Sequence, residues 1–309
     1  MEALQKEILI DETDDDTSHL NWFQISKSRD GEYQTPPEVA EAIYQVFKPL
    51  VKRNHIVFDP TAGSGRLLKP FKHVTNVFGI EFKDSLSNSL KHNIGAKNSR
   101  QCDLVSYAES FFDYSKRYPF VIANPPFGLK WETKSYRYSC KQNDESQFMA
   151  TCIALENLAI NGMIALIIPT STWTNQKDRR FVSYLKSNAK ILFKVTVKNA
   201  FKKEYKINLD TDIVFMKKLS RVYSWQNNEI NSTELDIKDI GLLPELVDLS
   251  EHEVPELDKT TIKEFYKSMP HVNKFTHFEP KFDSLTLNKQ GITGNEIQMS
   301  LLDFYKCRS

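Results

Sequence analysis

The sequence has few of the features that mark secreted, membrane-spanning or zinc-binding proteins. Its longest apolar run, Met163–Ile168, is far too short to cross a bilayer and indicates a buried strand. The acidic N-terminus contains Asp14-Asp15-Asp16 and no signal-peptide pattern, so we expect a protein that is neither secreted nor inserted in a membrane. The four cysteines show no paired metal-ligand spacing, which indicates reduced thiols and no zinc site: Cys102, Cys140, Cys152 and Cys307.

The chain also lacks an excess of either charge, internal repeats and low-complexity tracts. Its 41 Lys and Arg nearly balance 40 Asp and Glu, so any nucleic-acid surface has to be a local patch. A hydrophobic content of 40% supports a substantial core. The length of 309 residues favours one large domain with a smaller appendage.

Strand-like and helix-like segments alternate between residues 37 and 218. Short apolar runs predict strands at His55–Phe58, Asn76–Ile80, Pro119–Ala123, Met163–Ile168, Phe193–Val197 and Ile213–Met216. Apolar residues at helical spacing predict helices between several of them, for example at Leu86–His92 and from Phe148 to Leu158. This alternation predicts an α/β fold with an open, doubly wound and mostly parallel sheet.

Residues suited to ligand binding follow the first strands. The run from Asp59 to Gly65 comes directly after the first strand, and its glycines permit a tight turn against which a ligand can lie. We expect a helix to begin at this turn. Glu81 follows the second strand, about twenty residues beyond the glycines, where an acidic side chain can bind ribose hydroxyls. Asp103 is a third acidic position of this kind.

Another motif, Tyr33-Gln34-Thr35-Pro36, precedes the first strand and opens a predicted helix. Thr35 is expected to cap this helix, and Pro36 and Pro37 suit its first turn. The helix has an apolar face made by Val39, Ile43, Val46 and Phe47.

The motif Asn124-Pro125-Pro126-Phe127 follows the predicted strand Pro119–Ala123 and carries the most specific chemistry. An Asn side-chain oxygen and the next carbonyl can accept two hydrogen bonds from one planar NH2 group, which directs the nitrogen lone pair toward a methyl donor. Two consecutive prolines hold these acceptors without backbone adjustment. Phe127 offers a ring face on which a heterocycle can stack. Taken alone, the motif is equally typical of a strand-ending turn.

In this order, over about Tyr33 to Lys218, the motifs resemble the S-adenosylmethionine-dependent DNA adenine-N6 methyltransferases whose cofactor motifs precede the catalytic motif. The resemblance implies a Rossmann-like methyltransferase fold and S-adenosyl-L-methionine as cofactor. It implies that the cofactor is bound by Tyr33, Thr35, Pro36, Asp59, Thr61, Gly63, Gly65, Glu81, Phe82, Asp103 and Asn124. Asp59 would lie near the cofactor's ammonium group and Thr35 near its carboxylate. Glu81 would bind the ribose, and Asp103 the amino group of the cofactor adenine.

The resemblance also implies the reaction and double-stranded DNA as the partner. We therefore expect the protein to lie in the cytoplasm, at the nucleoid. An adenine leaves the duplex, its N6 hydrogens bond to Asn124 and the Pro125 carbonyl, and N6 attacks the sulfonium methyl directly. The implied catalytic residues are Asn124, Pro125, Pro126 and Phe127. Phe127 and Phe201 would sandwich the flipped ring, although an aromatic residue at position 201 is as often part of a core.

Aromatic and cationic residues interleave in the segment from Leu129 to Gln147. This composition suits DNA contact as much as a solvated surface loop. The candidate DNA contacts are Lys130, Trp131, Lys134, Tyr136 and Arg137.

We expect four parts in the chain: a flexible N-terminal arm (1–30), a catalytic domain (31–220), a small target-recognition or DNA-contact module (221–296) and a tail (297–309). The tail contains a peptide that resembles those by which DNA-processing enzymes attach to sliding clamps, with Gln298, Leu301, Phe304 and Tyr305 at the matching positions. A C-terminal helix docked on its own domain is the alternative.

Three other functions remain open at this point. Enzymes that methylate guanine N2 of ribosomal RNA or the side-chain amide of protein glutamine also use Asn-Pro-Pro with an aromatic residue. Phe127 and the Tyr33–Pro36 motif favour DNA. A noncatalytic DNA-binding subunit of a larger modification complex is the third alternative. A specificity subunit or a paired endonuclease is a further candidate partner, because the region after the methyltransferase-like part is short for sequence reading.

Overall fold

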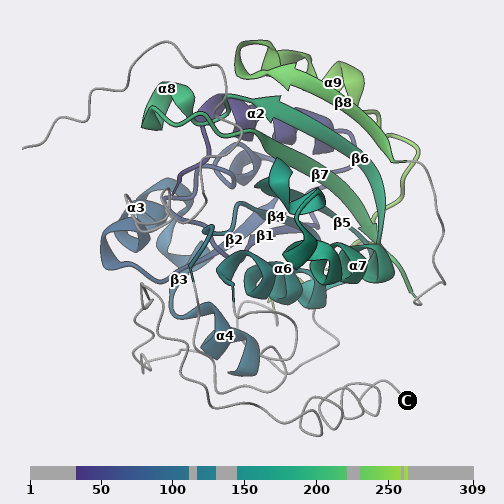
Figure 1. Cartoon of the computed structure of the whole chain (residues 1–309). Coiled ribbons are helices and arrows are strands. Elements are labelled where there is room, and N and C mark those ends of the chain that lie inside the picture. The colour runs from purple at the N-terminus through teal and green to yellow at the C-terminus, as the bar shows by residue number, and fades with distance from the viewer. Residues whose placement is uncertain (1–32, 111–116, 130–144, 221–229, 259–260, 264–309) are drawn as a thin grey trace, which may run out of the picture.

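Eight strands form one mixed sheet in the order β3-β2-β1-β4-β5-β7-β6-β8 (Figure 1). The computed structural model describes residues 33–110, 117–129, 145–220, 230–258 and 261–263. The strands are β1 (Ile56–Asp59), β2 (Asn76–Glu81), β3 (Ser99–Gln101), β4 (Tyr118–Ala123), β5 (Leu158–Pro169), β6 (Ala189–Lys198), β7 (Thr211–Lys218) and β8 (Asn231–Asp236). The α-helices are α2 (Pro37–Phe47), α3 (Asp84–Ile94), α4 (Leu104–Ser110), α6 (Ser146–Asn157), α7 (Arg179–Asn188), α8 (Lys202–Tyr205) and α9 (Leu243–Leu246).

The direction of the strands confirms the predicted mostly parallel, doubly wound sheet. Strands β3, β2, β1, β4 and β5 run parallel, and β7 is antiparallel to its two neighbours β5 and β6. Each of the predicted strands is present. The structure adds β3 and β8, which escaped prediction because both are polar and β3 has only 3 residues.

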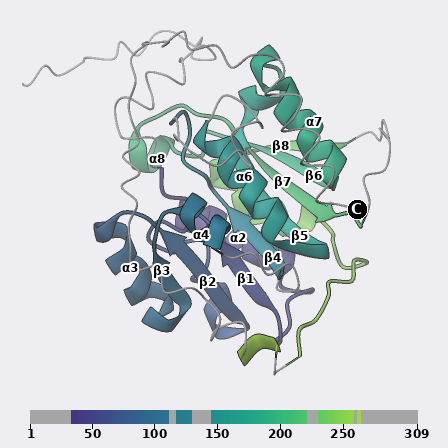
Figure 2. The ribbon, with the colours of Figure 1, turned by 90° about the horizontal axis from the view of Figure 1, so that it is seen from below.

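Alternate residues of the central strands pack against helices on opposite faces of the sheet. Ile56 and Phe58 of β1 belong to a cluster with residues of α4, α6 and α7, whereas Val57 belongs to a cluster with residues of α2 and α3. Figure 2 shows helices on both sides of the sheet. Because both faces are covered, the central strands are continuous apolar runs. None of the helices in the described part of the chain is long and apolar enough to span a bilayer.

The helix expected to begin at the glycine turn is not present. After Gly65 the chain makes turns, and the 3-10 segment η1 (Phe71–His73) is the first helical element before β2. The Lys69 amide does donate to the Gly65 carbonyl at 3.0 Å, as in one helical turn. Pro70 comes next and has no amide hydrogen with which to continue that pattern. The prediction of a helix at this point was wrong because Pro70 interrupts the helical hydrogen-bond pattern after one turn.

The predicted role of Thr35 as a helix cap is also wrong. The helix α2 begins at Pro37, its N-cap residue is Pro36, and no side chain caps it. The Pro36 carbonyl accepts the first α-helical hydrogen bond, from the Ala40 amide at 3.1 Å. The Thr35 side chain is buried and points to another partner, which is described below.

The segment after residue 230 extends the sheet on the side of β6. Strand β8 pairs with β6 in parallel, and α9 with the 3-10 segment η5 (Ile237–Leu242) packs against α2. The amide of Leu257 then donates to the carbonyl of Asn54, just before β1. The sheet therefore continues past the boundary expected at residue 220. The division of the chain into domains stays a prediction.

Candidate active site

Four side chains expected to bind ligand lie at one edge of the sheet. Asp59 ends β1, Glu81 ends β2, and Asp103 and Asn124 follow β3 and β4. These four strands are neighbours and parallel, so their carboxyl ends meet. Ligands of open α/β sheets bind at this edge. The position of each residue after its strand was enough to predict the grouping.

Two hollows lie at this edge. The main hollow is lined by Tyr33, Gln34, Pro60, Thr61, Gly63, Ile80, Glu81, Phe82, Lys83, Leu86, Cys102, Asp103, Leu104, Asn124, Pro126 and Leu129. A smaller polar hollow is lined by Tyr33, Gln34, Thr35, Asp59, Thr61, Ala62, Gly63, Arg66, Leu67 and Asn124. Most of the expected cofactor residues line one or both. Pro36 and Gly65 line neither, and neither do Pro125, Phe127 and Phe201 of the expected catalytic and stacking set.

The glycine turn packs closely against the Tyr33–Pro36 motif. The Gln34 side-chain oxygen accepts from the Ser64 amide at 2.9 Å and from the Ser64 hydroxyl at 3.0 Å. Gly63 has a φ of +55°, and a Cβ there would lie 2.4 Å from Gln34 Nε2. Gly65 has a φ of +83°, and a Cβ there would lie 2.7 Å from Leu90 Cδ1, so the end of that side chain would have to shift. Both positions require glycine because of backbone conformation and close packing.

We expect Gly63→Ala to destabilise the protein by about 1–3 kcal/mol, because the left-handed conformation is strained for alanine and Gln34 must leave Ser64. Cofactor affinity should fall at least about tenfold, since the turn lines both hollows. Thermal unfolding and calorimetric titration with S-adenosylmethionine measure the two effects. Gly241→Ala is the matched control, because a Cβ at Gly241 meets nothing within 4 Å. Equal effects of the two substitutions would contradict the assignment.

Three oxygens around the polar hollow lack donors. Asp59 Oδ2, Thr61 Oγ1 and Asn124 Oδ1 are buried and have no hydrogen-bond partner among the described residues. The other oxygen of Asp59 accepts from the Thr61 amide at 3.0 Å. Burial raises the pKa of Asp59 to about 8. A hollow with unsatisfied acceptors and a buried carboxyl fits a ligand with an ammonium group.

The other two acidic side chains bind backbone amides near the main hollow. Glu81 Oε1 accepts from the Lys83 amide at 2.7 Å, and Asp103 Oδ1 accepts from the Ser106 amide at 2.7 Å. Burial raises the pKa of Asp103. Each carboxylate is thereby fixed in direction, which prepares it to accept hydrogen bonds from a ligand.

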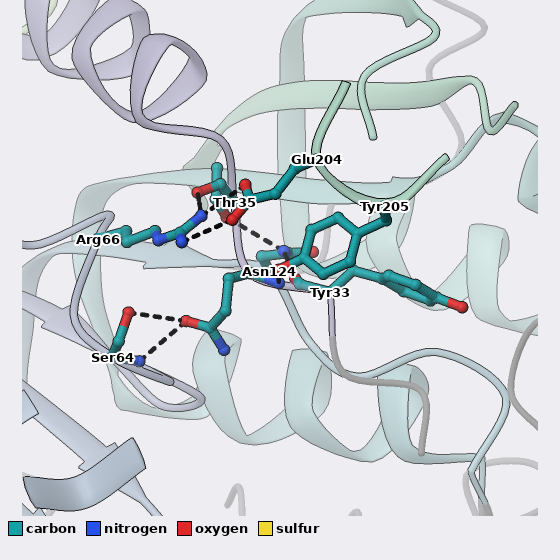
Figure 3. A network of polar contacts seen from close by, with 8 residues as sticks. Tyr33, Thr35, Ser64, Arg66, Asn124, Glu204 and Tyr205 are labelled. Carbon is teal, nitrogen blue, oxygen red and sulfur yellow. Dashed lines mark hydrogen bonds and ion pairs between the residues drawn. The ribbon is translucent and has the colours of Figure 1, made fainter. Parts of the chain in front are cut away.

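The Asn124 side chain is held by the Tyr33–Pro36 motif (Figure 3). Its Nδ2 donates to the Tyr33 carbonyl at 2.8 Å and to Thr35 Oγ1 at 3.1 Å. Its Oδ1 is the buried acceptor without a partner in the described part of the chain. Asn124 thus combines a fixed amide with a buried, unsatisfied acceptor in a residue that lines both hollows.

The two rings expected to stack on a base are buried in the core. Phe127 is 2% exposed and Phe201 is 1% exposed. The ring centroid of Phe201 lies 5.8 Å from that of Tyr33, and Tyr33 packs edge-on against Tyr205 at 5.3 Å. Stacking on a base therefore stays a prediction, and it requires these two buried rings to become exposed.

The structure adds a second group of contacts that sequence reasoning missed. Arg66 binds Glu204 of α8 through an ion pair of 2.6 Å and donates to the Thr35 carbonyl at 3.3 Å (Figure 3). The Tyr205 hydroxyl accepts from the Gln34 amide at 2.8 Å. No sequence signal connects Arg66 with Glu204, because the two are separated by 138 residues.

Other predicted residues lie outside the described part of the chain. These are the candidate DNA contacts Lys130, Trp131, Lys134, Tyr136 and Arg137 and the clamp-like peptide residues Gln298, Leu301, Phe304 and Tyr305. The expected arm of residues 1–30 lies outside it as well.

Together, the mostly parallel sheet, the glycine turn after β1 and the acidic residues after β2 and β3 define a Rossmann-like fold of the class I S-adenosylmethionine-dependent methyltransferases. The chain belongs to the N-6 DNA methylase family, whose sequence model matches residues 19–221. S-adenosylmethionine is its cofactor. No curated protein sequence matches the chain.

Solved structures share the fold at low sequence identity. A Listeria monocytogenes protein assigned to the class I S-adenosylmethionine-dependent methyltransferases has a TM-score of 0.50 and 16% identity, with coverage of 71% of this chain and 76% of that one. The type I restriction-modification methyltransferase subunit of Streptococcus thermophilus has a TM-score of 0.51 and 18% identity, covering 79% and 54%. The structure of the DrdV-DNA complex has a TM-score of 0.56 and 12% identity, with coverage of 74% of this chain and 30% of that one. The chain thus spans about half the length of the Streptococcus subunit.

Proposed function

We propose that the protein transfers a methyl group from S-adenosylmethionine to N6 of an adenine flipped out of double-stranded DNA. One observation carries the proposal: Asn124 Oδ1 is a buried acceptor without a partner among the described residues, beside the hollow for the cofactor. A planar exocyclic amine is the group that such an acceptor, followed by the carbonyl of Pro125, would bind. Membership in the N-6 DNA methylase family supports DNA as the substrate.

In the proposed reaction the cofactor supplies an electrophilic methyl group on a sulfonium. Asn124 Oδ1 and the Pro125 carbonyl accept the two N6 hydrogens, and this draws the nitrogen lone pair out of conjugation with the ring. The lone pair would then form the bond to the methyl carbon as the carbon–sulfur bond breaks and its electron pair goes to the leaving sulfur. The methylated nitrogen would release one of its two hydrogens as a proton to solvent. Because the acceptors are fixed before the base arrives, little reorganisation is needed during the reaction.

The cofactor residues have the following proposed roles. Asp59 pairs with the ammonium group, Glu81 binds the ribose hydroxyls, and Asp103 binds the adenine amino group. Gly63 allows the methionine part to lie against the backbone. These roles are supported by the carboxylates at the strand ends and by the unsatisfied Asp59 oxygen. Phe127 and Phe201 are proposed to hold the base once these buried rings become exposed.

Recognition of the DNA sequence is proposed to involve more than this chain's catalytic domain (31–220). The Leu129–Gln147 segment and the 221–296 region are the candidates within the chain. A specificity subunit or paired endonuclease is a candidate partner, because the chain is similar in fold to a type I restriction-modification subunit. The clamp-like peptide of the tail (297–309) stays a hypothesis.

The experiment is methyl transfer from labelled S-adenosylmethionine to separate DNA, RNA and protein substrates. We expect label in double-stranded DNA, and recovery of N6-methyladenine after digestion to nucleosides. Label in RNA guanine or in protein glutamine would replace the proposal by one of those reactions. Binding of the cofactor without transfer to any adenine-containing duplex would instead favour a noncatalytic subunit.

A further inference from the structure

The orientation of the Asn124 amide is fixed by chemistry. The Tyr33 carbonyl has no hydrogen, so the Asn124 group that lies 2.8 Å from it must be the NH2 group. The second hydrogen of that group goes to Thr35 Oγ1 at 3.1 Å. A flipped amide would place two oxygens against each other. The Oδ1 atom therefore faces away from Tyr33, without a partner in the described residues.

Thr35 is itself held firmly. Thr35 is only 4% exposed. Arg66, which is paired with Glu204, donates to the Thr35 carbonyl at 3.3 Å. The chain on its other side enters α2 directly, with Pro36 as the N-cap. The hydroxyl oxygen thus lies at a set position. One acceptor would leave the amide plane free to rock, whereas two acceptors on the two hydrogens fix it.

We propose that Thr35 is a positioning residue that holds the Asn124 amide so that Oδ1 points at the substrate amine. This inference rests on the proposed function and differs from the expected contact of Thr35 with the cofactor carboxylate. The Thr35 hydroxyl accepts from Asn124 and acts on the reaction through it. Small errors in the placement of a catalytic group lower rates strongly, so we expect removal of the Thr35 hydroxyl to lower kcat.

The kinetic experiment compares Thr35→Val, Thr35→Ser and Thr75→Val. Valine keeps the shape and removes the acceptor, and we expect kcat to fall roughly 10–100-fold with the cofactor Kd changed less than about threefold. Serine restores the hydroxyl and should recover most of the loss. Thr75 is the matched control, since its hydroxyl also bonds, to the Lys52 and His55 carbonyls, at the opposite edge of the sheet. Cofactor binding weakened tenfold at unchanged kcat, or no change in either, would overturn the proposal.

A second measurement tests whether Thr35 holds the Asn124 amide in place, and its result does not depend on methyl transfer. In protein labelled with 15N-asparagine, the Asn124 side-chain resonance is identified by its loss in Asn124→Asp. We expect slow exchange of this NH2 group with solvent in the unsubstituted protein and in Thr35→Ser, and faster exchange in Thr35→Val. Unchanged exchange in Thr35→Val overturns the proposal. Absence of methyl transfer in the unsubstituted protein would refute the proposed function alone, because the exchange result still tests Thr35.

Discussion

Asn124→Ala is expected to lower the rate of methyl transfer by about 10³-fold or more, while the Kd for S-adenosylmethionine changes only a few-fold. The alanine has no acceptor for the substrate amine, so the lone pair stays conjugated with the ring. The Pro125 carbonyl alone cannot replace it. Single-turnover methylation of a duplex with labelled cofactor measures the rate, and calorimetry measures the affinity.

The separation between rate and affinity follows from where Asn124 lies. It borders both hollows, yet its NH2 group is already used by Tyr33 and Thr35. The remaining Oδ1 is an acceptor without a donor in the described part of the chain. The proposed cofactor contacts come instead from Asp59, Glu81 and Asp103. Removal of Asn124 therefore removes an interaction of the reacting amine, which acts on the chemical step.

Asn157→Ala is the matched control for this substitution. The Asn157 amide also donates to a backbone carbonyl, that of Ile153 at 2.9 Å, and the residue is 4% exposed. It lies before β5, at the opposite edge of the sheet from the hollows. We expect similar destabilisation and an unchanged methylation rate. If both variants lose the same activity, or if Asn124→Ala loses cofactor binding in parallel, the role given to Asn124 is wrong.

The sheet and the grouping of strand-end residues could be predicted because they depend on local patterns. Buried parallel strands are apolar runs, and the residue that follows such a run lies at the carboxyl edge. This pattern alone was enough to predict that Asp59, Glu81 and Asn124 lie at this edge. The polar strands β3 and β8 could not be found in this way, since they are not apolar runs and their pairing depends on neighbours distant in sequence.

The bonds within the site could not be predicted from local patterns. Threonine before a proline-initiated helix suggested a cap, but the fold brings Asn124, 89 residues later, within 3.1 Å of its hydroxyl. The ion pair of Arg66 with Glu204 is likewise a product of the tertiary arrangement. Long-range hydrogen bonds of this kind compete with local ones, and their outcome depends on the packing around them.

Asp59→Asn is expected to weaken binding of S-adenosylmethionine roughly 10–100-fold. The buried Oδ2 of Asp59 has no partner among the described residues, and the proposed partner is the ammonium group of the cofactor. A hydrogen bond to a charged group contributes about 1.5–3 kcal/mol, which corresponds to this range. Asparagine keeps the oxygen that accepts from the Thr61 amide. The expected loss of affinity therefore measures the contribution of the negative charge of Asp59.

Asp178→Asn provides the control for this loss of charge. Asp178 is also a buried carboxyl with its pKa raised mainly by burial, and it lines neither hollow. Its substitution should leave cofactor affinity unchanged. Affinity that is insensitive to Asp59→Asn would remove Asp59 from the cofactor site.

The pKa of Asp59 gives the affinity a pH dependence of known sign. With a pKa raised to about 8 by burial, the carboxyl is mostly protonated in the free protein at pH 6–7.5. Pairing with an ammonium group requires the carboxylate, so binding releases a proton. Affinity should then rise with pH across this window, by up to about tenfold per pH unit, and Asp59→Asn should abolish the rise. Calorimetric titrations in buffers of different ionisation enthalpy measure both affinity and proton release.

The same group makes the stability of the free protein fall as pH rises. The folded state holds the Asp59 proton up to its raised pKa of about 8, whereas the unfolded chain loses it near the ordinary pKa of 3.8. The stabilisation is therefore complete below that lower value and is lost as pH increases toward 8. Between these limits, the unfolding free energy of the unsubstituted protein relative to Asp59→Asn should decrease by up to about 1.4 kcal/mol per pH unit. Denaturant titrations of both proteins from pH 5 to 8 measure this difference, and a difference that rises with pH would show that Asp59 is ionised in the fold.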